Sequence, residues 1–354
     1  MPRFYLSAFE SAPKQIHLFN LKTGLAVQNA GLRHQCYRHG FYGPDDRVEK
    51  ALAELEAHAA PVLRWIRARR ALPPSGSGER VALLAFVALQ ALRTTVMADR
   101  NNAHLDKLTK QIYAREPQAI AHQFEASRFE YENPVLPALR HLPLMLEAIA
   151  DLSAHLVVSC DRLFVTSDNP AFRYNQYCEH IDHVGTTGAL NRGFQAFVPL
   201  APDLCLVLFD PTTYTAGLAD RWRGFSLATT ADEEALNTIQ LVAAAEQIYF
   251  SDWTTAPIVR ALAVDAQRLR IADPTVVVEY GQDDDPSRSL VHSFVRTPCL
   301  DLKLSFLEAR RCARRVPLLA RAQQVRRNTV IPAWPESPDR ARRPITFSRF
   351  LGRR

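Results

Sequence analysis

The spacing of apolar residues changes near His155 in this 354-residue chain. Before that point, the apolar side chains from Val48 to Ile66 recur at the period of an amphipathic helix. After it, short β-prone runs such as 204–208 alternate with turn residues. We therefore predict an α+β fold, in which a helical layer from about 45 to 152 packs on a small, mostly antiparallel sheet.

Turn residues and capping signals divide both halves of the chain into elements. Further helices are expected at about 79–101, 103–130, 137–152 and 230–250, the last opened by a capping box of Thr230 and Glu233. Hairpins are expected to join 16–19 to 25–27 and 156–158 to 163–165, with further strands at 196–198 and 204–208.

The positive charge of the chain is concentrated at its C-terminal end. Residues 309–354 hold thirteen arginines and two acidic residues, whereas the whole chain has a net charge of +6, so residues 1–308 are net negative. We expect a single domain over 1–300, a basic helix over 301–327 and an Arg/Pro-rich tail over 328–354. Nucleic acid would then bind weakly and without sequence preference through the tail.

The composition argues against several classes of protein. The longest apolar run, 81–92, is about half the roughly 20 residues of a membrane-spanning helix, so no membrane span is expected. The N-terminal residues do not predict a secretory signal, which favours a cytoplasmic location. The six cysteines form no C-x-x-C pair, and no glycine-rich phosphate loop occurs.

Several short motifs follow one another over the first 255 residues. They are Met1-Pro2-Arg3-Phe4-Tyr5-Leu6 with Phe9, Cys36-Tyr37 with Gly40-Phe41-Tyr42, Glu49 with Glu56, Leu89-Gln90 with Leu92-Arg93-Thr94, Phe164 to Pro170, and Pro199-Leu200 with Pro202-Asp203. In this order and spacing, the chain resembles the bacterial family catalogued as domain of unknown function 4238. The resemblance implies a fold family and a bacterial source but no reaction.

The first residues depart from the pattern of that family. Its members usually begin with a His-x-hydrophobic-Pro segment, and here Met1 occupies the hydrophobic position before Pro2. Because the valine codon GTG also serves as a bacterial start, we expect the reading frame to continue upstream and to supply the histidine. An in-frame stop codon there, or the lack of a histidine codon, would contradict this expectation.

Two polar residues lie where the sequence predicts a buried helix. Gln90 and Arg93 are three residues apart after the apolar positions of 81–89, so they share a face and at least one is expected to be buried. A buried guanidinium needs a carboxylate, for which Glu56 and Asp168 are the candidates. Arg93 would then either clamp an anionic substrate or form a structural ion pair between helix and sheet.

Three carboxylates are candidate ligands of a divalent cation. Glu49 and Glu56 lie on one stripe of a helix, and Asp168 follows a strand, so the three could converge on Mg²⁺. Alternatively, the glutamates form the polar edge of an amphipathic helix, and Asp168 and Asn169 form the turn before Pro170.

These residues are compatible with two functions. The first is an intracellular hydrolase, in particular a metal-dependent phosphodiesterase or nuclease, with Glu56, Gln90, Arg93, Asp168 and Asn169 as its catalytic residues. The second is a non-catalytic recognition, immunity, defence or regulatory protein in which the same residues form a structural polar core. An open cleft shared by Glu56, Arg93 and Asp168 would favour the hydrolase, and a sealed, paired network would favour recognition.

Overall fold

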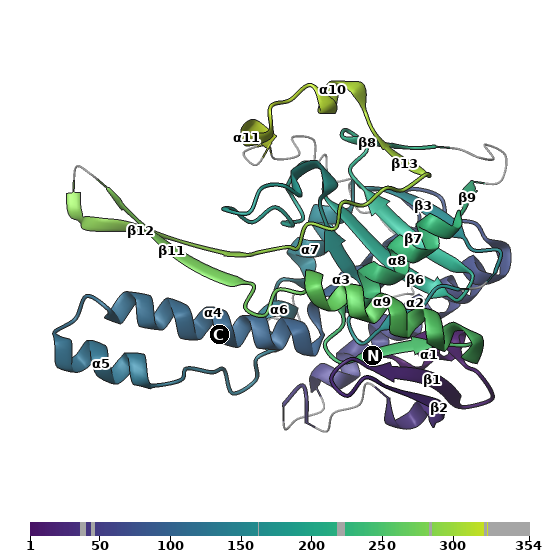
Figure 1. The fold of residues 1–354 in the computed structure, drawn as a ribbon, viewed down its shortest axis with the longest axis horizontal. Helices are drawn as coiled ribbons and strands as arrows, with labels where there is room; N and C mark the ends of the chain where they lie inside the picture. The colour runs from purple at the N-terminus through teal and green to yellow at the C-terminus, as the bar shows by residue number, and fades with distance from the viewer. Residues whose placement is uncertain are drawn as a thin grey trace, which may run out of the picture.

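Two mostly antiparallel sheets and a layer of helices make up the body of the molecule, and a long arm extends from it (Figure 1). The computed structural model describes residues 1–35, 40–43, 47–161, 163–217, 224–282, 285–321 and 324. The described chain is an α+β fold, as predicted. The Arg/Pro-rich tail over 328–354 lies outside the described residues, so its predicted role stays a prediction.

The larger sheet has the strand order β5-β6-β7-β3-β9. Its strands are β3 (Ser153–Val158), β5 (Phe172–Tyr174), β6 (Gln195–Ala201), β7 (Leu204–Phe209) and β9 (Phe225–Leu227). Neighbouring strands are antiparallel except β3 and β9, which are parallel. Every residue of β6 and β7 is buried, which shows that both faces of the sheet are covered.

Successive side chains of this sheet enter two different cores. In β7, Leu206 and Leu208 join the cluster formed with the helical layer, whereas Cys205 and Val207 join the cluster on the other face. The helical layer contains α1 (Arg3–Leu6), α2 (Arg47–Arg69), α3 (Gly78–Leu92), α6 (Leu136–Leu139) and α7 (Leu142–Ile149). The opposite face is covered by α8 (Thr230–Ala243) and by apolar residues between 302 and 313.

The smaller sheet has the strand order β2-β1-β10-β4. It combines the N-terminal hairpin, β1 (Gln15–Asn20) and β2 (Leu25–Gly31), with β4 (Thr166–Ser167) and β10 (Gln247–Phe250). Helix α9 (Ala256–Leu269) packs beside it, and Val259 and Ala266 are buried against the sheet. The N-terminal hairpin is therefore confirmed. A single sheet was predicted, however, and the hairpin belongs to a second sheet, separate from the one that contains β6 and β7.

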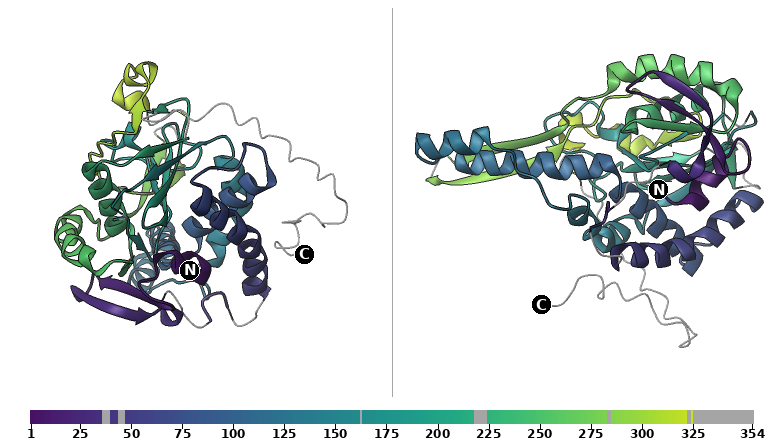
Figure 2. Two further views of the ribbon diagram at one scale, coloured as in Figure 1. Left: turned by 90° about the vertical axis from the view of Figure 1, so that its right-hand side faces the viewer. Right: turned by 90° about the horizontal axis from the view of Figure 1, so that it is seen from below.

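A helical pair and a β-hairpin form the arm, which extends from the body in Figure 1 and in the right-hand view of Figure 2. Its elements are α4 (Thr95–Tyr113), α5 (Gln118–Ala126), β11 (Thr275–Gln282) and β12 (Asp285–Val295). The carboxylate of Glu279 accepts hydrogen bonds from Gln111 and Arg115, and the Ser293 hydroxyl is 2.6 Å from Nδ1 of His104. These contacts join the hairpin to α4.

Two predicted elements, a hairpin and a helix, are wrong in their details. The segment after β3 does not return as a hairpin, because the two edges of β3 pair with β7 and β9. The helix expected over 230–250 ends at Ala243, and the chain then forms β10. Its capping box lies one residue earlier than predicted, with Thr229 as N-cap and Asp232 as the third helical residue.

The segment predicted as one basic helix over 301–327 has a different structure in its described part. It contains β13 (Leu307–Ala309), which pairs with β8 (Tyr214–Ala216), and the short helices α10 (Arg311–Arg314) and α11 (Leu318–Arg321). Strand formation is favoured here because Leu302, Leu304 and Phe306 are buried in the core beside α8.

No single helix in the described ranges is long and apolar enough to span a membrane. Helices α3 and α4 meet that criterion only as a pair, and they are bent by 55° relative to each other.

Candidate functional site

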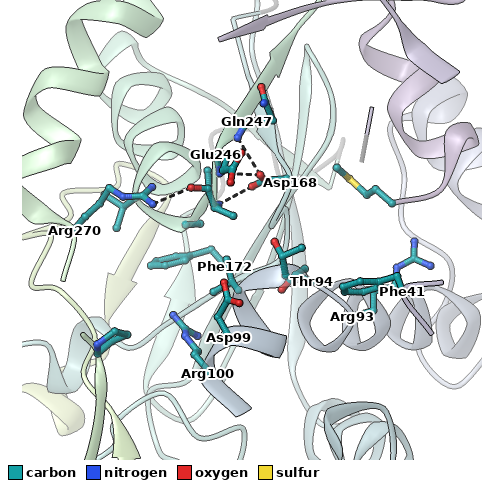
Figure 3. Close-up of a pocket in the computed structure, with 18 of the residues that line it drawn as sticks. Phe41, Arg93, Thr94, Asp99, Arg100, Asp168, Phe172, Glu246, Gln247 and Arg270 are labelled. Atoms are coloured by element: carbon teal, nitrogen blue, oxygen red, sulfur yellow. Dashed lines mark hydrogen bonds between the residues drawn. The ribbon is translucent and has the colours of Figure 1, made fainter. Parts of the chain in front are cut away.

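A large cavity lies beside the junction of α3 and α4. Its volume is about 1090 Å³. Asp168, Glu246 and Gln247 lie on one side of it, and Arg93, Thr94, Asp99 and Arg100 lie on the opposite side (Figure 3). The cavity thus brings together the helical layer, the smaller sheet and the base of the arm.

A helix break positions the residues on the α3–α4 side. Arg93 is the C-cap of α3, and Thr94 is the N-cap of α4, where its side chain accepts a hydrogen bond of 3.3 Å from the backbone N–H of Met97. The helix predicted over 79–101 is therefore two helices. The break turns the chain so that Arg93, Thr94 and Arg100 all line the cavity.

Arg93 is buried and pairs with Glu56, as one of the two sequence-based alternatives predicted. Its guanidinium donates to the Glu56 carboxylate, and it lies 3.4 Å from Oε1 of Gln90. Arg93 and Glu56 line the cavity, whereas Gln90 lies behind them and is 1% exposed. Nε of Arg93 and Nε2 of Gln90 have no hydrogen-bond partner among the described residues. Burial also raises the pKa of the neighbouring Tyr42.

Asp168 holds the turn that precedes β10. Its carboxylate oxygens accept hydrogen bonds from the backbone N–H groups of Ala245, Glu246 and Gln247 at 2.7, 2.9 and 3.0 Å (Figure 3). Burial raises the pKa of Asp168, and the three N–H donors act in the opposite direction. These bonds end α8, because they use the N–H groups that would continue the helix.

Asn169, predicted to be catalytic, does not line the large cavity. Its side-chain amide donates to the carbonyl oxygen of Ala243 at 2.8 Å, and its backbone N–H donates to the Ser167 hydroxyl at 3.3 Å. Asn169 lines a second, smaller cavity described below.

The predicted magnesium ligands do not form a metal-binding group. Among the described residues, no three His, Cys, Asp or Glu side chains are close enough to hold a metal ion. Glu49, Glu56 and Asp168 all line the large cavity, but Glu56 pairs with Arg93, and both oxygens of Asp168 accept backbone N–H groups. Two of the three predicted ligands are thus engaged by other groups of the protein.

Several cations around the large cavity also have partners. Lys22 pairs with Glu246, and Arg270 donates to the carbonyl oxygens of Leu241 and Ala245 at 2.8 and 3.3 Å. Arg100 differs, because its buried Nε has no hydrogen-bond partner in the described part of the chain. Burial lowers the pKa of Arg100 to about 10, and the charge of nearby Arg173 lowers it as well.

A smaller cavity of about 40 Å³ adjoins the large one at Arg100. Arg173, the central residue of β5, also lines it, as does the exposed Arg296, which follows β12. Burial lowers the pKa of Arg173, and no described carboxylate forms an ion pair with it. Sequence reasoning missed both Arg100, which follows Asp99 and precedes Asn101, and Arg173, which lies between Phe172 and Tyr174, since only the fold brings the two arginines together.

One family matches most of the chain. It is described as "Protein of unknown function (DUF4238)", and the match covers residues 1–254. The chain belongs to this family. No curated protein and no solved structure matches it. The DUF4238 region includes Arg93, Arg100, Asp168 and Arg173, whereas Arg296 lies beyond it.

The two cavities of this DUF4238 protein differ in the chemistry they offer. In the large cavity, the predicted catalytic side chains Glu56, Arg93 and Asp168 are held in place by protein partners. The small cavity is lined by Arg100, Arg173 and Arg296, and no ion pair joins Arg100 or Arg173 to a carboxylate of the described residues. The arrangement can therefore bind an anion.

Proposed function

We propose that this protein recognises a small anionic molecule, which binds in the large cavity. One observation carries the proposal: the side chain of Arg100 lines that cavity, its Nε has no hydrogen-bond partner, and no ion pair joins it to a carboxylate of the described residues. A partly buried guanidinium without a partner is unfavourable, and an anionic ligand would remove that penalty. The volume of about 1090 Å³ is large enough for a whole small molecule such as a nucleotide.

The state of the predicted catalytic groups favours recognition over catalysis. A general base or nucleophile must be free to reach its substrate. Glu56 is instead engaged by Arg93, and Asp168 accepts three backbone hydrogen bonds. These interactions support a polar framework that shapes the cavity.

A hydrolase is the second candidate, and one observation favours it. Glu56, Arg93 and Asp168 come from three separate segments and nevertheless line one cavity. A substrate that displaced the Glu56–Arg93 pair would meet a carboxylate and a guanidinium side by side, which suits cleavage of a phosphodiester.

A bacterial and cytoplasmic setting is part of the proposal. The resemblance to a bacterial family supports the source. The five described cysteines, Cys160, Cys178, Cys205, Cys299 and Cys312, are free thiols, which suits a reducing compartment.

The proposal is tested by a binding screen with matched pairs of compounds. Each phosphorylated metabolite is compared with its dephosphorylated form by thermal shift and then by calorimetry, at constant ionic strength. We expect the phosphorylated member of at least one pair to bind the native protein. It should bind Arg100→Gln at least about tenfold more weakly, because the loss of one charge-assisted hydrogen bond lowers the affinity by about that factor. Equal binding by both members of every pair would overturn the proposal.

The same compounds separate recognition from hydrolysis. Each ligand is incubated with the protein, with divalent cations or with a chelator, and its products are followed by chromatography. An unchanged ligand supports recognition. Turnover that Glu56→Gln removes would establish the hydrolase instead.

A further inference from the structure

We infer that the small cavity is a subsite for the terminal phosphoryl group of a phosphomonoester, held between the guanidinium groups of Arg100 and Arg173. The inference rests on the proposed function and deepens it, since it states which anion is recognised and by which residues. The remainder of the ligand then extends into the large cavity.

The charges of the two arginines are the first argument. Arg100 is on α4 and Arg173 is on β5, so two elements distant in sequence direct cations at one small space. Each guanidinium is desolvated, and the charge of Arg173 acts on Arg100. Among the described residues, no ion pair joins a carboxylate to either of them, and Nε of Arg100 has no hydrogen-bond partner. A dianion between them would supply both missing charges, and a phosphomonoester is a dianion near neutral pH.

The size of the cavity is the second argument. A cavity needs about 10 to 15 Å³ to hold one water molecule. The small cavity, at about 40 Å³, therefore has room for the three terminal oxygens of a phosphoryl group. It has no room for a second ester substituent, so a phosphodiester is disfavoured.

Neutral donors complete the walls. The hydroxyl groups of Thr187 and Thr297 lie 3.4 Å apart and both line the small cavity, where either can donate to a phosphoryl oxygen. Asn169 lines it too, and its side chain is fixed by the carbonyl oxygen of Ala243. The residue predicted to be catalytic from the sequence is thus a wall of this subsite.

The two cavities share a common border. Thr94, Arg100 and Phe172 line both of them, so a ligand anchored in the small cavity continues directly into the large one (Figure 3). The ring of Phe172 offers an apolar surface to the organic part of the ligand at this border. A phosphomonoester with an organic group therefore fits both spaces at once.

A structural role and a binding role for Arg173 predict opposite effects of its replacement on the stability of the free protein. If Arg173 only stabilised the fold, its replacement would destabilise the free protein. If Arg173 instead serves to bind an anion, Arg173→Met removes a desolvated charge that has no ion-pair partner among the described residues, and it keeps the aliphatic part of the side chain. We then expect the melting temperature of the free protein to stay the same or rise, while stabilisation by phosphate disappears.

The test uses full-length protein and three probes, namely inorganic phosphate, methyl phosphate and dimethyl phosphate. Calorimetry at constant ionic strength measures their affinity for the native protein, for Arg173→Met and Arg100→Gln, and for the control Arg260→Gln. Arg260 is an exposed residue of α9 that lines neither cavity. We expect phosphate and methyl phosphate to bind the native and control proteins and to bind the two cavity variants at least about tenfold more weakly. Dimethyl phosphate should bind weakly to all four.

The outcomes separate the subsite from the proposed function. Equal affinity for methyl phosphate and dimethyl phosphate, or unchanged affinity in both cavity variants, overturns the subsite. If larger phosphorylated compounds still bind in that case, the proposed function stands. If no phosphorylated compound binds the native protein, both are wrong. A melting temperature of free Arg173→Met well below that of Arg260→Gln would also contradict the subsite.

Discussion

At the scale of single residues, the partner of a buried charge decides what its removal does. Arg93 has a carboxylate partner in Glu56, and its side chain is 4% exposed. We predict that Arg93→Ala destabilises the protein by about 3 kcal/mol or more, because Glu56 loses its partner at a site that is largely removed from water. Arg93→Met should be less damaging, since it keeps the packing of the stem. Chemical denaturation measures the free energy of unfolding of both variants. Equally small decreases in that free energy would mean that the Arg93–Glu56 pair contributes little to stability.

Asp168 gives a second prediction at this scale. In Asp168→Asn, one oxygen becomes an amide NH₂, which cannot accept a hydrogen bond from Ala245, Glu246 or Gln247. We expect a loss of about 1.5 to 3 kcal/mol, the range for hydrogen bonds to a charged group. Asp273→Asn is the control, because its exposed ion pair with Lys107 should contribute at most about 1 kcal/mol. Similar losses in the two variants would show that Asp168 does not hold this turn.

The candidate site was only partly accessible from the sequence. Apolar periodicity identified Arg93 as buried, because one polar residue interrupted a regular pattern, and the required carboxylate narrowed its partner to Glu56 or Asp168. The same reasoning could not show that Asp168 is engaged by the backbone of 245–247, since main-chain donors leave no mark in a sequence. Arg173 was missed because its significance lies in a missing partner, which only the assembled fold reveals.

At the scale of elements, the N-terminus of α8 links local and long-range structure. Asp232 accepts hydrogen bonds from the Thr229 backbone and side chain, and also from the backbone and side chain of Ser305. We predict that Thr229→Ala costs about 1 kcal/mol, as for other N-caps. Asp232→Ala should cost more, since it also releases the segment around Ser305 from the core. If Thr229→Ala and Asp232→Ala lowered the free energy of unfolding equally in chemical denaturation, Asp232 would act only as part of the helix cap and would not hold the segment around Ser305.

Some sequence patterns were sufficient to predict an element, and others were not. The apolar period of α2 and the glycine-containing turn between β1 and β2 predicted these elements correctly, because both patterns depend on residues that are close in sequence. The capping box was found one residue too late, because Thr229 and Thr230 are chemically equivalent as caps and the choice is made by packing. The segment at 163–165 was assigned to the wrong partner, since short β-prone runs do not specify which strand they meet.

At the scale of the whole molecule, charge and packing divide the chain at different places. Residues 301–316 were expected to lie outside the domain, yet Leu304 and Phe306 are part of its core. Attachment continues to the last described residue: the Arg192 guanidinium donates to Oε1 of Gln324 at 2.9 Å, and Arg321 lies over the ring of Tyr177 at 4.7 Å. A truncation intended to remove only the basic end must therefore follow Gln324.

That truncation gives the last prediction. Residues 325–354 hold eight arginines and two acidic residues, so the chain that ends at Gln324 has a formal net charge of zero. Its melting temperature should match that of the full chain, because the contacts of Arg321 and Gln324 remain. If the basic end binds nucleic acid, the full chain should bind DNA of any sequence, with an affinity that falls steeply with salt as counterions are released, and the truncated chain should not bind. Circular dichroism confirms folding, and binding is followed by fluorescence anisotropy. Tight, sequence-selective binding by the folded, truncated chain would place the nucleic-acid site on the domain instead.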